Sequence, residues 1–254
     1  MTTAIVSAMH EELAAVLALI PDEHRQVSAG RDFWLGHLHG QAVVAVLSRI
    51  GKVAAATTAT VLIERFGVPR IVFTGVAGGL APGVNVGDIV VGDSFLQHDL
   101  DASPIFPKYQ VPLYGTDRFA ADPRLSEQLA QAAQLALPGV RLHRGLVVSG
   151  DRFVSTTVEC RALQGALPQA LAVEMEGAAI AQVCHDYGVP FAAVRTVSDR
   201  ADDDAHGDFA RFIQEVASRH SAAIVGCFLR LLPGQGPAME WEPGGRGACA
   251  APSE

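Results

Sequence analysis

The sequence LAVEMEGAAIA, from Leu171 to Ala181, decides the fold of this chain. It begins as a short apolar run that is typical of a buried strand, and it continues as a helix of small residues. Glu174, Met175 and Glu176 lie at the join, which is the carboxyl end of the strand, where open α/β sheets bind ligands. A solvated strand end would also explain the two acids. Both flanks are apolar, however, and a buried acid requires a partner or a function, so we predict a binding site here.

The composition is typical of an α/β protein. The chain has 254 residues, and 49% of them are hydrophobic although only 6% are aromatic. Aliphatic residues in this proportion suit strands that are covered by helices on both faces. The net charge of −8, without any basic cluster, argues against nucleic acid and anionic membranes as partners. No apolar run is long enough to cross a bilayer, so we expect no membrane partner.

Cysteine usage and the first residues predict a cytoplasmic protein. The four cysteines lie far apart without a CxxC pair, and the first twelve residues lack the basic start of a signal peptide. His98, Asp99 and Asp101 form a small cluster that a solvated loop explains more simply than a metal site does. We therefore expect a reduced chain with no metal and no cofactor.

Strands and helices alternate through most of the chain, and this pattern predicts a three-layer α/β/α fold with a central mixed β-sheet. A glycine-rich segment, Gly75–Leu80, follows a buried strand and predicts a turn, which either lets a ligand approach the backbone closely or is a tight structural turn. We expect a single domain over residues 1–232. Residues 233–254 are rich in Pro, Gly and Ala without apolar periodicity, and they predict a disordered tail. Predicted segments include a first strand at 4–6, a helix from about 10, a hairpin over 33–47, helices at 52–66 and 123–137, a strand at 191–197 and a last helix at about 207–231.

Seven short motifs occur in an order that identifies a family. They are SAMHEE (7–12), IGKVAAA (50–56), TGVAGGL (74–80), VGDIVV (86–91), SGD (149–151), VEME (173–176) and VSD (197–199). Together they resemble the 5′-methylthioadenosine/S-adenosylhomocysteine nucleosidases of the nucleoside phosphorylase superfamily. The resemblance runs from residue 4 to about residue 232, and it implies a nucleoside phosphorylase-like fold.

The resemblance implies that water cleaves the N-glycosidic bond between adenine and a 5′-modified ribose. This reaction leaves an oxocarbenium-like sugar, and the purine leaves more readily when its N7 is protonated. Asp199 matches the family's acid at N7, although a helix N-cap is the alternative interpretation. Glu12 matches the carboxylate that activates water on the opposite face of the sugar. Arg195 would hold Glu12 or the water, and a structural ion pair is equally compatible with the sequence.

Other residues match the binding of the nucleoside. Glu176 matches the acid that accepts hydrogen bonds from the ribose hydroxyls and supports the developing positive charge. Met175 would pack on the ribose and Phe153 would stack on adenine, with the Phe153 and Val154 backbone along the purine edge; core packing is the alternative for each side chain. The resemblance also places a further set of residues in the substrate pocket: Val76, Ala77, Gly78, Glu174 and Ser198.

The 5′ substituent requires an apolar slot, which by resemblance Met9, Ile50 and Phe209 line. A loop of a neighbouring subunit closes this slot in the family. Here that loop corresponds to the proline-rich segment 97–122, which is too apolar for a linker and too irregular for a helix. We therefore expect a homodimer, whose partner subunit supplies Ile105, Phe106 and Tyr109.

Two alternatives to a hydrolase remain open at this point. A phosphorylase of the same superfamily would need cations for phosphate, and Arg31 and Arg49 are the candidates. Many relatives carry Ser or Thr where this chain has Val76, and the loss of that hydroxyl is the one feature that supports a nucleoside-binding protein without catalysis. A carboxylate beside the nucleophile, as at Glu12, would repel phosphate and favours hydrolysis over phosphorolysis. Glu12, Glu176 and Asp199 together argue against a loss of catalysis.

Overall fold

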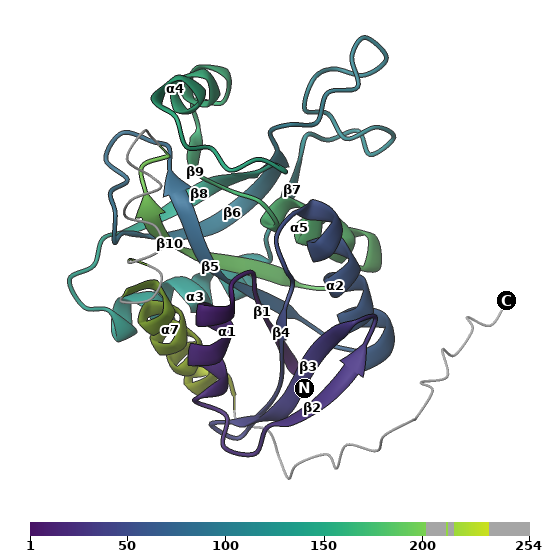
Figure 1. Ribbon diagram of the computed structural model, residues 1–254, viewed down its shortest axis with the longest axis vertical. Helices are drawn as coiled ribbons and strands as arrows, with labels where there is room; N and C mark the ends of the chain where they lie inside the picture. The colour runs from purple at the N-terminus through teal and green to yellow at the C-terminus, as the bar shows by residue number, and fades with distance from the viewer. Residues whose placement is uncertain (202–211, 213–215, 234–254) are drawn as a thin grey trace, which may run out of the picture.

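The structure is a computed structural model that describes residues 1–201, 212 and 216–233 (Figure 1). The described residues form one sheet of ten strands in the order β10-β6-β8-β9-β5-β1-β4-β3-β2, with β7 added beside β6. The strands are β1 (Thr3–Ser7), β2 (His24–Ser28), β3 (Arg31–Leu38), β4 (Gln41–Leu47), β5 (Ile71–Gly79), β6 (Ile89–Gln97), β7 (Arg118–Ala120), β8 (Leu142–Ser149), β9 (Ala170–Glu174) and β10 (Phe191–Asp199).

Helices cover both faces of the sheet, as the sequence predicts. Helices α2 and α5 pack on one face, where Leu62 and Ile180 join a core with Phe73. Helices α1, α3 and α7 cover the other face, where Val16 and Phe228 belong to a second core (Figure 1). The helix bounds are α1 (His10–Leu17), α2 (Lys52–Phe66), α3 (Pro123–Ala136), α4 (Thr157–Ala166), α5 (Gly177–Tyr187) and α7 (Ser218–Leu231).

The sheet is mixed, and part of it closes on itself. One edge of β5 pairs in parallel with β10, and the other edge pairs first with β1 and then, antiparallel, with β9. Because β10 pairs with β6, β6 with β8 and β8 with β9, these strands and β5 form a closed ring of pairings. The ring brings the ends of β5, β9 and β10 together.

The prediction of a turn at the glycine-rich segment 75–80 is wrong. Residues up to Gly79 belong to β5, where Gly75 and Gly78 pair with Arg195 and Asp199 of β10. The glycines suggested a turn because glycine is frequent in turns. Here they are strand residues, and the space around them explains their presence, as described for the site below.

The ends of several elements follow local sequence rules. Gly67 and Gly188 directly follow α2 and α5 and cap their carboxyl ends. Their φ angles of 57° and 63° are in the left-handed conformation, which glycine adopts without strain. The join in LAVEMEGAAIA lies where predicted, because β9 ends at Glu174 and α5 begins at Gly177. The predicted hairpin forms from β3 and β4.

The segment between β6 and β7 extends away from the body of the protein as an arm, at the upper right of Figure 1. Ile105 and Leu113 on this arm are 82% and 92% exposed, whereas Phe106 and Tyr109 are half-buried. Exposed apolar side chains on a projecting segment are typical of a surface that contacts a partner. Among the described helices, none is long and apolar enough to cross a membrane.

Candidate active site

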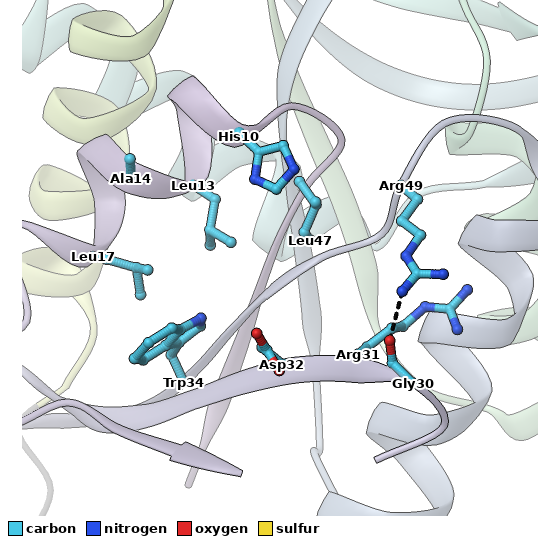
Figure 2. A pocket seen from close by; sticks show the side chains of 10 residues that line it. All are labelled: His10, Leu13, Ala14, Leu17, Gly30, Arg31, Asp32, Trp34, Leu47 and Arg49. Carbon is cyan, nitrogen blue, oxygen red and sulfur yellow. Dashed lines mark hydrogen bonds between the residues drawn. The ribbon is translucent and has the colours of Figure 1, made fainter. Parts of the chain in front are cut away.

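A cavity of about 330 Å³ lies at the carboxyl ends of β1, β5, β9 and β10. Its walls combine apolar side chains with three carboxyl groups and one guanidinium group. The lining residues are Ala8, Met9, Glu12, Ile50, Phe73, Gly75, Val76, Ala77, Phe153, Val173, Glu174, Met175, Glu176, Arg195 and Ser198. A larger cleft of about 480 Å³, which His10 and Leu13 of α1 help to line, contains none of these carboxyl groups (Figure 2).

Glu12 is fully buried at the start of α1. Its Oε2 accepts a hydrogen bond from the Met9 backbone N–H at 3.2 Å, and its Oε1 has no hydrogen-bond partner among the described residues. Burial raises the pKa of Glu12 to about 7, although the positive charge of Arg195 opposes the rise. A carboxyl with this pKa and an unpaired oxygen is suited to exchange a proton at neutral pH.

Arg195 forms a buried ion pair with Glu174. Its Nη2 lies 2.9 Å from Glu174 Oε2, and its guanidinium stacks over the Phe73 ring at 3.6 Å from the ring centroid. Glu174 also accepts hydrogen bonds from the Ser149 hydroxyl and from the backbone N–H groups of residues 176 and 177. These contacts support the structural ion pair that was the alternative for Arg195. The positive charge of Arg195 also acts on Glu12, where it opposes part of the rise in pKa that burial causes.

Glu176 lies at the start of α5 and is 5% exposed. Its Oε1 accepts a hydrogen bond from the Gly51 backbone N–H at 2.7 Å, which links the join after β9 to the start of α2. Burial raises the pKa of Glu176, and the nearby charge of Glu174 raises it further. Hydrogen-bond donors such as sugar hydroxyls would stabilise its ionised form.

Asp199 is the last residue of β10 and is 3% exposed. Its Oδ2 accepts a hydrogen bond from the Ser198 hydroxyl at 2.7 Å, and its Oδ1 accepts one from the Ala201 backbone N–H at 2.7 Å. Ser198 lines the cavity, so this carboxyl lies directly behind the cavity wall. These hydrogen bonds fix the orientation of the carboxyl that the sequence predicts as the acid at N7.

Two glycines of β5 provide room for these acids. A methyl group added at Gly75 would lie 3.1 Å from Glu12 Oε1 and 3.3 Å from Arg195 Nη1, and one at Gly78 would lie 3.0 Å from Asp199 Oδ1. Sequence reasoning missed this role because it interpreted the glycines as a turn. The available signal was that these glycines directly continue the buried strand that follows the helix at 52–66.

The cavity brings together most of the residues that the sequence predicts for the substrate. Val154 is instead buried in a core beside Leu80, which supports core packing for its side chain. Gly78 lies behind the wall at Asp199, and Phe209 is outside the described residues. Ile105, Phe106 and Tyr109 belong to the arm and do not line the cavity of their own subunit. The described residues contain no group of three His, Cys, Asp or Glu that could hold a metal ion.

Comparisons with known proteins identify the family. The sequence model of the phosphorylase superfamily matches residues 2–230. A 5′-methylthioadenosine/S-adenosylhomocysteine nucleosidase from Anoxybacillus flavithermus is 39% identical over 226 residues, which are 89% of this chain and 96% of the relative. The nucleosidase from Neisseria meningitidis, solved with methylthio-immucillin-A, is 36% identical with a TM-score of 0.87 over 91% of this chain and 99% of the other.

A second solved structure extends this agreement. A mutant of the Helicobacter pylori enzyme, solved with 5′-methylthioadenosine in its active site, is 31% identical to this chain with a TM-score of 0.85, over 91% of this chain and 99% of that one. The likeness in sequence and in structure covers nearly all of both chains. The chain therefore belongs to the phosphorylase superfamily and, within it, to the 5′-methylthioadenosine/S-adenosylhomocysteine nucleosidases.

Proposed function

We propose that the protein hydrolyses the N-glycosidic bond of 5′-modified adenosines to adenine and the free 5′-modified ribose. The substrates are 5′-methylthioadenosine, S-adenosylhomocysteine and 5′-deoxyadenosine. The observation that carries the proposal is Glu12, a fully buried carboxyl in a mostly apolar cavity, whose pKa burial raises to about 7 and whose Oε1 has no hydrogen-bond partner in the described part of the chain. The nucleosidase names of the relatives agree with it.

Glu12 and Asp199 are assigned opposite roles in the reaction. Glu12 accepts a proton from the water that attacks the anomeric carbon, and Asp199 donates a proton to N7 of the leaving adenine. The two carboxyls approach β5 at Gly75 and Gly78, positions separated by about 10 Å along a strand. The proposed reaction requires the sugar and the attacking water to lie between the two acids.

The remaining lining residues hold the nucleoside. Glu176 accepts hydrogen bonds from the ribose hydroxyls, and its carboxylate stabilises the positive charge that develops on the sugar. Met175 packs on the ribose, and Phe153 provides an aromatic surface for adenine. When protonated, Asp199 donates to N7 while its other oxygen accepts from the adenine 6-amino group, which favours adenine over a 6-oxopurine.

The charges in the cavity favour water over phosphate as the nucleophile. Arg195 is the guanidinium that lines the cavity, and it is already paired with Glu174. Arg31 and Arg49 line neighbouring clefts instead of the cavity that contains Glu12. A phosphate ion beside Glu12 would meet carboxyl groups without a free cation among the described lining residues, so phosphorolysis is disfavoured.

The enzyme is proposed to work as a homodimer in the cytoplasm. The arm between β6 and β7 exposes Ile105 away from its own cavity, as a segment that closes the 5′ slot of a partner subunit would. The described cysteines form no disulfide, which agrees with a reducing compartment.

Adenine release from 5′-methylthioadenosine, measured with phosphate absent and then added, tests the proposed function. We expect release without phosphate and the free sugar as the second product. Release only in the presence of phosphate, with a sugar 1-phosphate as product, would establish a phosphorylase. Binding of the nucleoside without any release would establish a protein that has lost catalysis.

Glu12→Gln is expected to lower kcat for adenine release by about 10²-fold or more, because the amide cannot accept a proton from water. Steady-state kinetics with 5′-methylthioadenosine measure this change. Glu11→Gln is the matched control, since it removes the same charge from the neighbouring, less buried residue of α1. Equal activity of Glu12→Gln and the wild type would overturn the assignment of the water activator.

The raised pKa of Glu12 also makes stability depend on pH. The carboxyl ionises near 4.5 in the unfolded chain and near 7 in the fold, so its contribution to stability is present below pH 4.5 and is lost as the pH rises to about 7. Glu12→Gln should therefore raise the free energy of unfolding by up to about 3 kcal/mol at about pH 8 and change it little at about pH 4. Urea unfolding at both pH values measures the difference, and an equal change at the two would contradict the prediction.

Asp199→Asn should lose most of its activity, by about 10²-fold or more, while it still binds 5′-methylthioadenosine. The amide keeps the shape of the side chain but cannot deliver a proton to N7. Adenine release measures the first effect and calorimetry measures binding. Asp93→Asn is the control, because Asp93 forms a partly exposed ion pair with Arg144 and does not line the cavity. Near-normal turnover by Asp199→Asn would refute the role at N7.

A further inference from the structure

Two arginines beside the active site have no acidic partner among the described residues. Arg31 donates hydrogen bonds to the backbone carbonyls of Ala29 and Ala54, both at 3.1 Å, and Arg49 donates one to the carbonyl of Gly30 at 2.5 Å. The buried Nε of Arg31 has no hydrogen-bond partner within residues 1–201, 212 and 216–233. Arg195, the arginine that lines the active-site cavity, is by contrast paired with Glu174.

The two guanidinium groups lie next to each other, as Figure 2 shows. Burial and the charge of Arg49 together lower the pKa of Arg31, so the pair carries an unfavourable like-charge contact. Carbonyl oxygens satisfy part of their hydrogen-bonding capacity but do not neutralise their charge. An anion between the two groups would relieve the repulsion and occupy donors that are still available.

The arginines also line a groove of about 490 Å³ that borders the active-site cavity. Ile50 lines both the groove and the cavity, and by resemblance it belongs to the slot for the 5′ substituent. Asp151 also lines the groove, and its Oδ1 accepts a hydrogen bond from the Lys52 backbone N–H at 2.7 Å. The groove thus begins where a 5′ substituent leaves the cavity, and it contains charges of both signs.

We propose that this groove binds the zwitterionic amino-acid end of the 5′ substituent of S-adenosylhomocysteine. The carboxylate lies between Arg31 and Arg49, and the ammonium group faces Asp151. The methylthio group of 5′-methylthioadenosine ends at Ile50 and does not enter the groove. This inference rests on the proposed function, because it names residues of this chain that select among the substrates of the same active site.

The test compares kcat/KM for three substrates that differ only beyond the 5′ sulfur. S-adenosylhomocysteine carries the zwitterion, 5′-butylthioadenosine carries an apolar tail with the same number of carbons, and 5′-methylthioadenosine has no tail. Arg31→Ala and Arg49→Ala should each reduce kcat/KM for S-adenosylhomocysteine about tenfold through KM, since each removes a charge-assisted hydrogen bond. The other two substrates should change little. Added salt should raise KM for S-adenosylhomocysteine alone.

Arg25→Ala is the matched control: it removes the same charge from β2, the strand paired with the one that Arg31 begins, and Arg25 pairs with Asp32 outside the groove. Asp151→Asn should raise KM for S-adenosylhomocysteine and leave KM for the two uncharged tails unchanged. Arg49→Gln is a second variant that retains a donor towards Gly30, and turnover of 5′-methylthioadenosine in every sample reports whether the variant has folded.

The outcomes separate this inference from the proposed function. An equal loss for all three substrates in the arginine variants would make the pair structural, and no loss for S-adenosylhomocysteine would show that its tail does not enter the groove. Either result overturns the inference while leaving hydrolysis intact. Failure of the wild type to release adenine from any of the three substrates would instead refute the proposed function.

Discussion

The buried ion pair between Arg195 and Glu174 is the contact on which the active site depends. It joins β10 to the end of β9, and the other hydrogen bonds of Glu174 come from Ser149 at the end of β8 and from the backbone at the start of α5. Four elements therefore meet at one carboxylate. Both partners are almost completely buried, so loss of either would leave an uncompensated charge inside the protein, which is strongly destabilising. The ion pair and the hydrogen bonds of Glu174 thus hold the ends of β8 and β9, strand β10 and the start of α5 together around the cavity.

The same ion pair sets the electrostatics of the cavity. Since the Arg195 guanidinium is committed to Glu174, it offsets only part of the desolvation of Glu12 and Glu176, and both carboxyls have raised pKa values. When these carboxyls are ionised, they stabilise a sugar that becomes positively charged and repel an anionic nucleophile. Val76 fits this environment, because a side chain without a hydroxyl offers no donor to phosphate. The choice of water over phosphate thus follows from which charges are already paired.

The sequence predicted the layers of the fold and the join at Glu174–Gly177, because both depend on local apolar patterns and on terminating glycines. It did not predict β2 (His24–Ser28). The residues of this strand are mostly exposed and polar, and they lack the alternation of a half-buried strand. It misread Gly75 as part of a turn because the need for space beside Glu12 arises from an element that is distant in the chain. The acids were found through the order of short motifs, whereas the partner of Arg195 could be found only from the three-dimensional pairing of β9 and β10 with β5.

The structure separates the chemistry of the reaction from the choice of substrate. The bond that breaks is the same in every 5′-modified adenosine, so the acids and the ribose contacts can stay on strand ends and helix starts that the core holds rigidly. In the proposed binding mode the 5′ substituent points instead to the rim, where Arg49 and Ile50 lie in the loop after β4 and Arg31 begins β3. Residues at the rim change with less effect on the core than residues inside it. A preference for a charged or an apolar tail can therefore evolve at the rim while Glu12, Glu176 and their supporting ion pair remain the same.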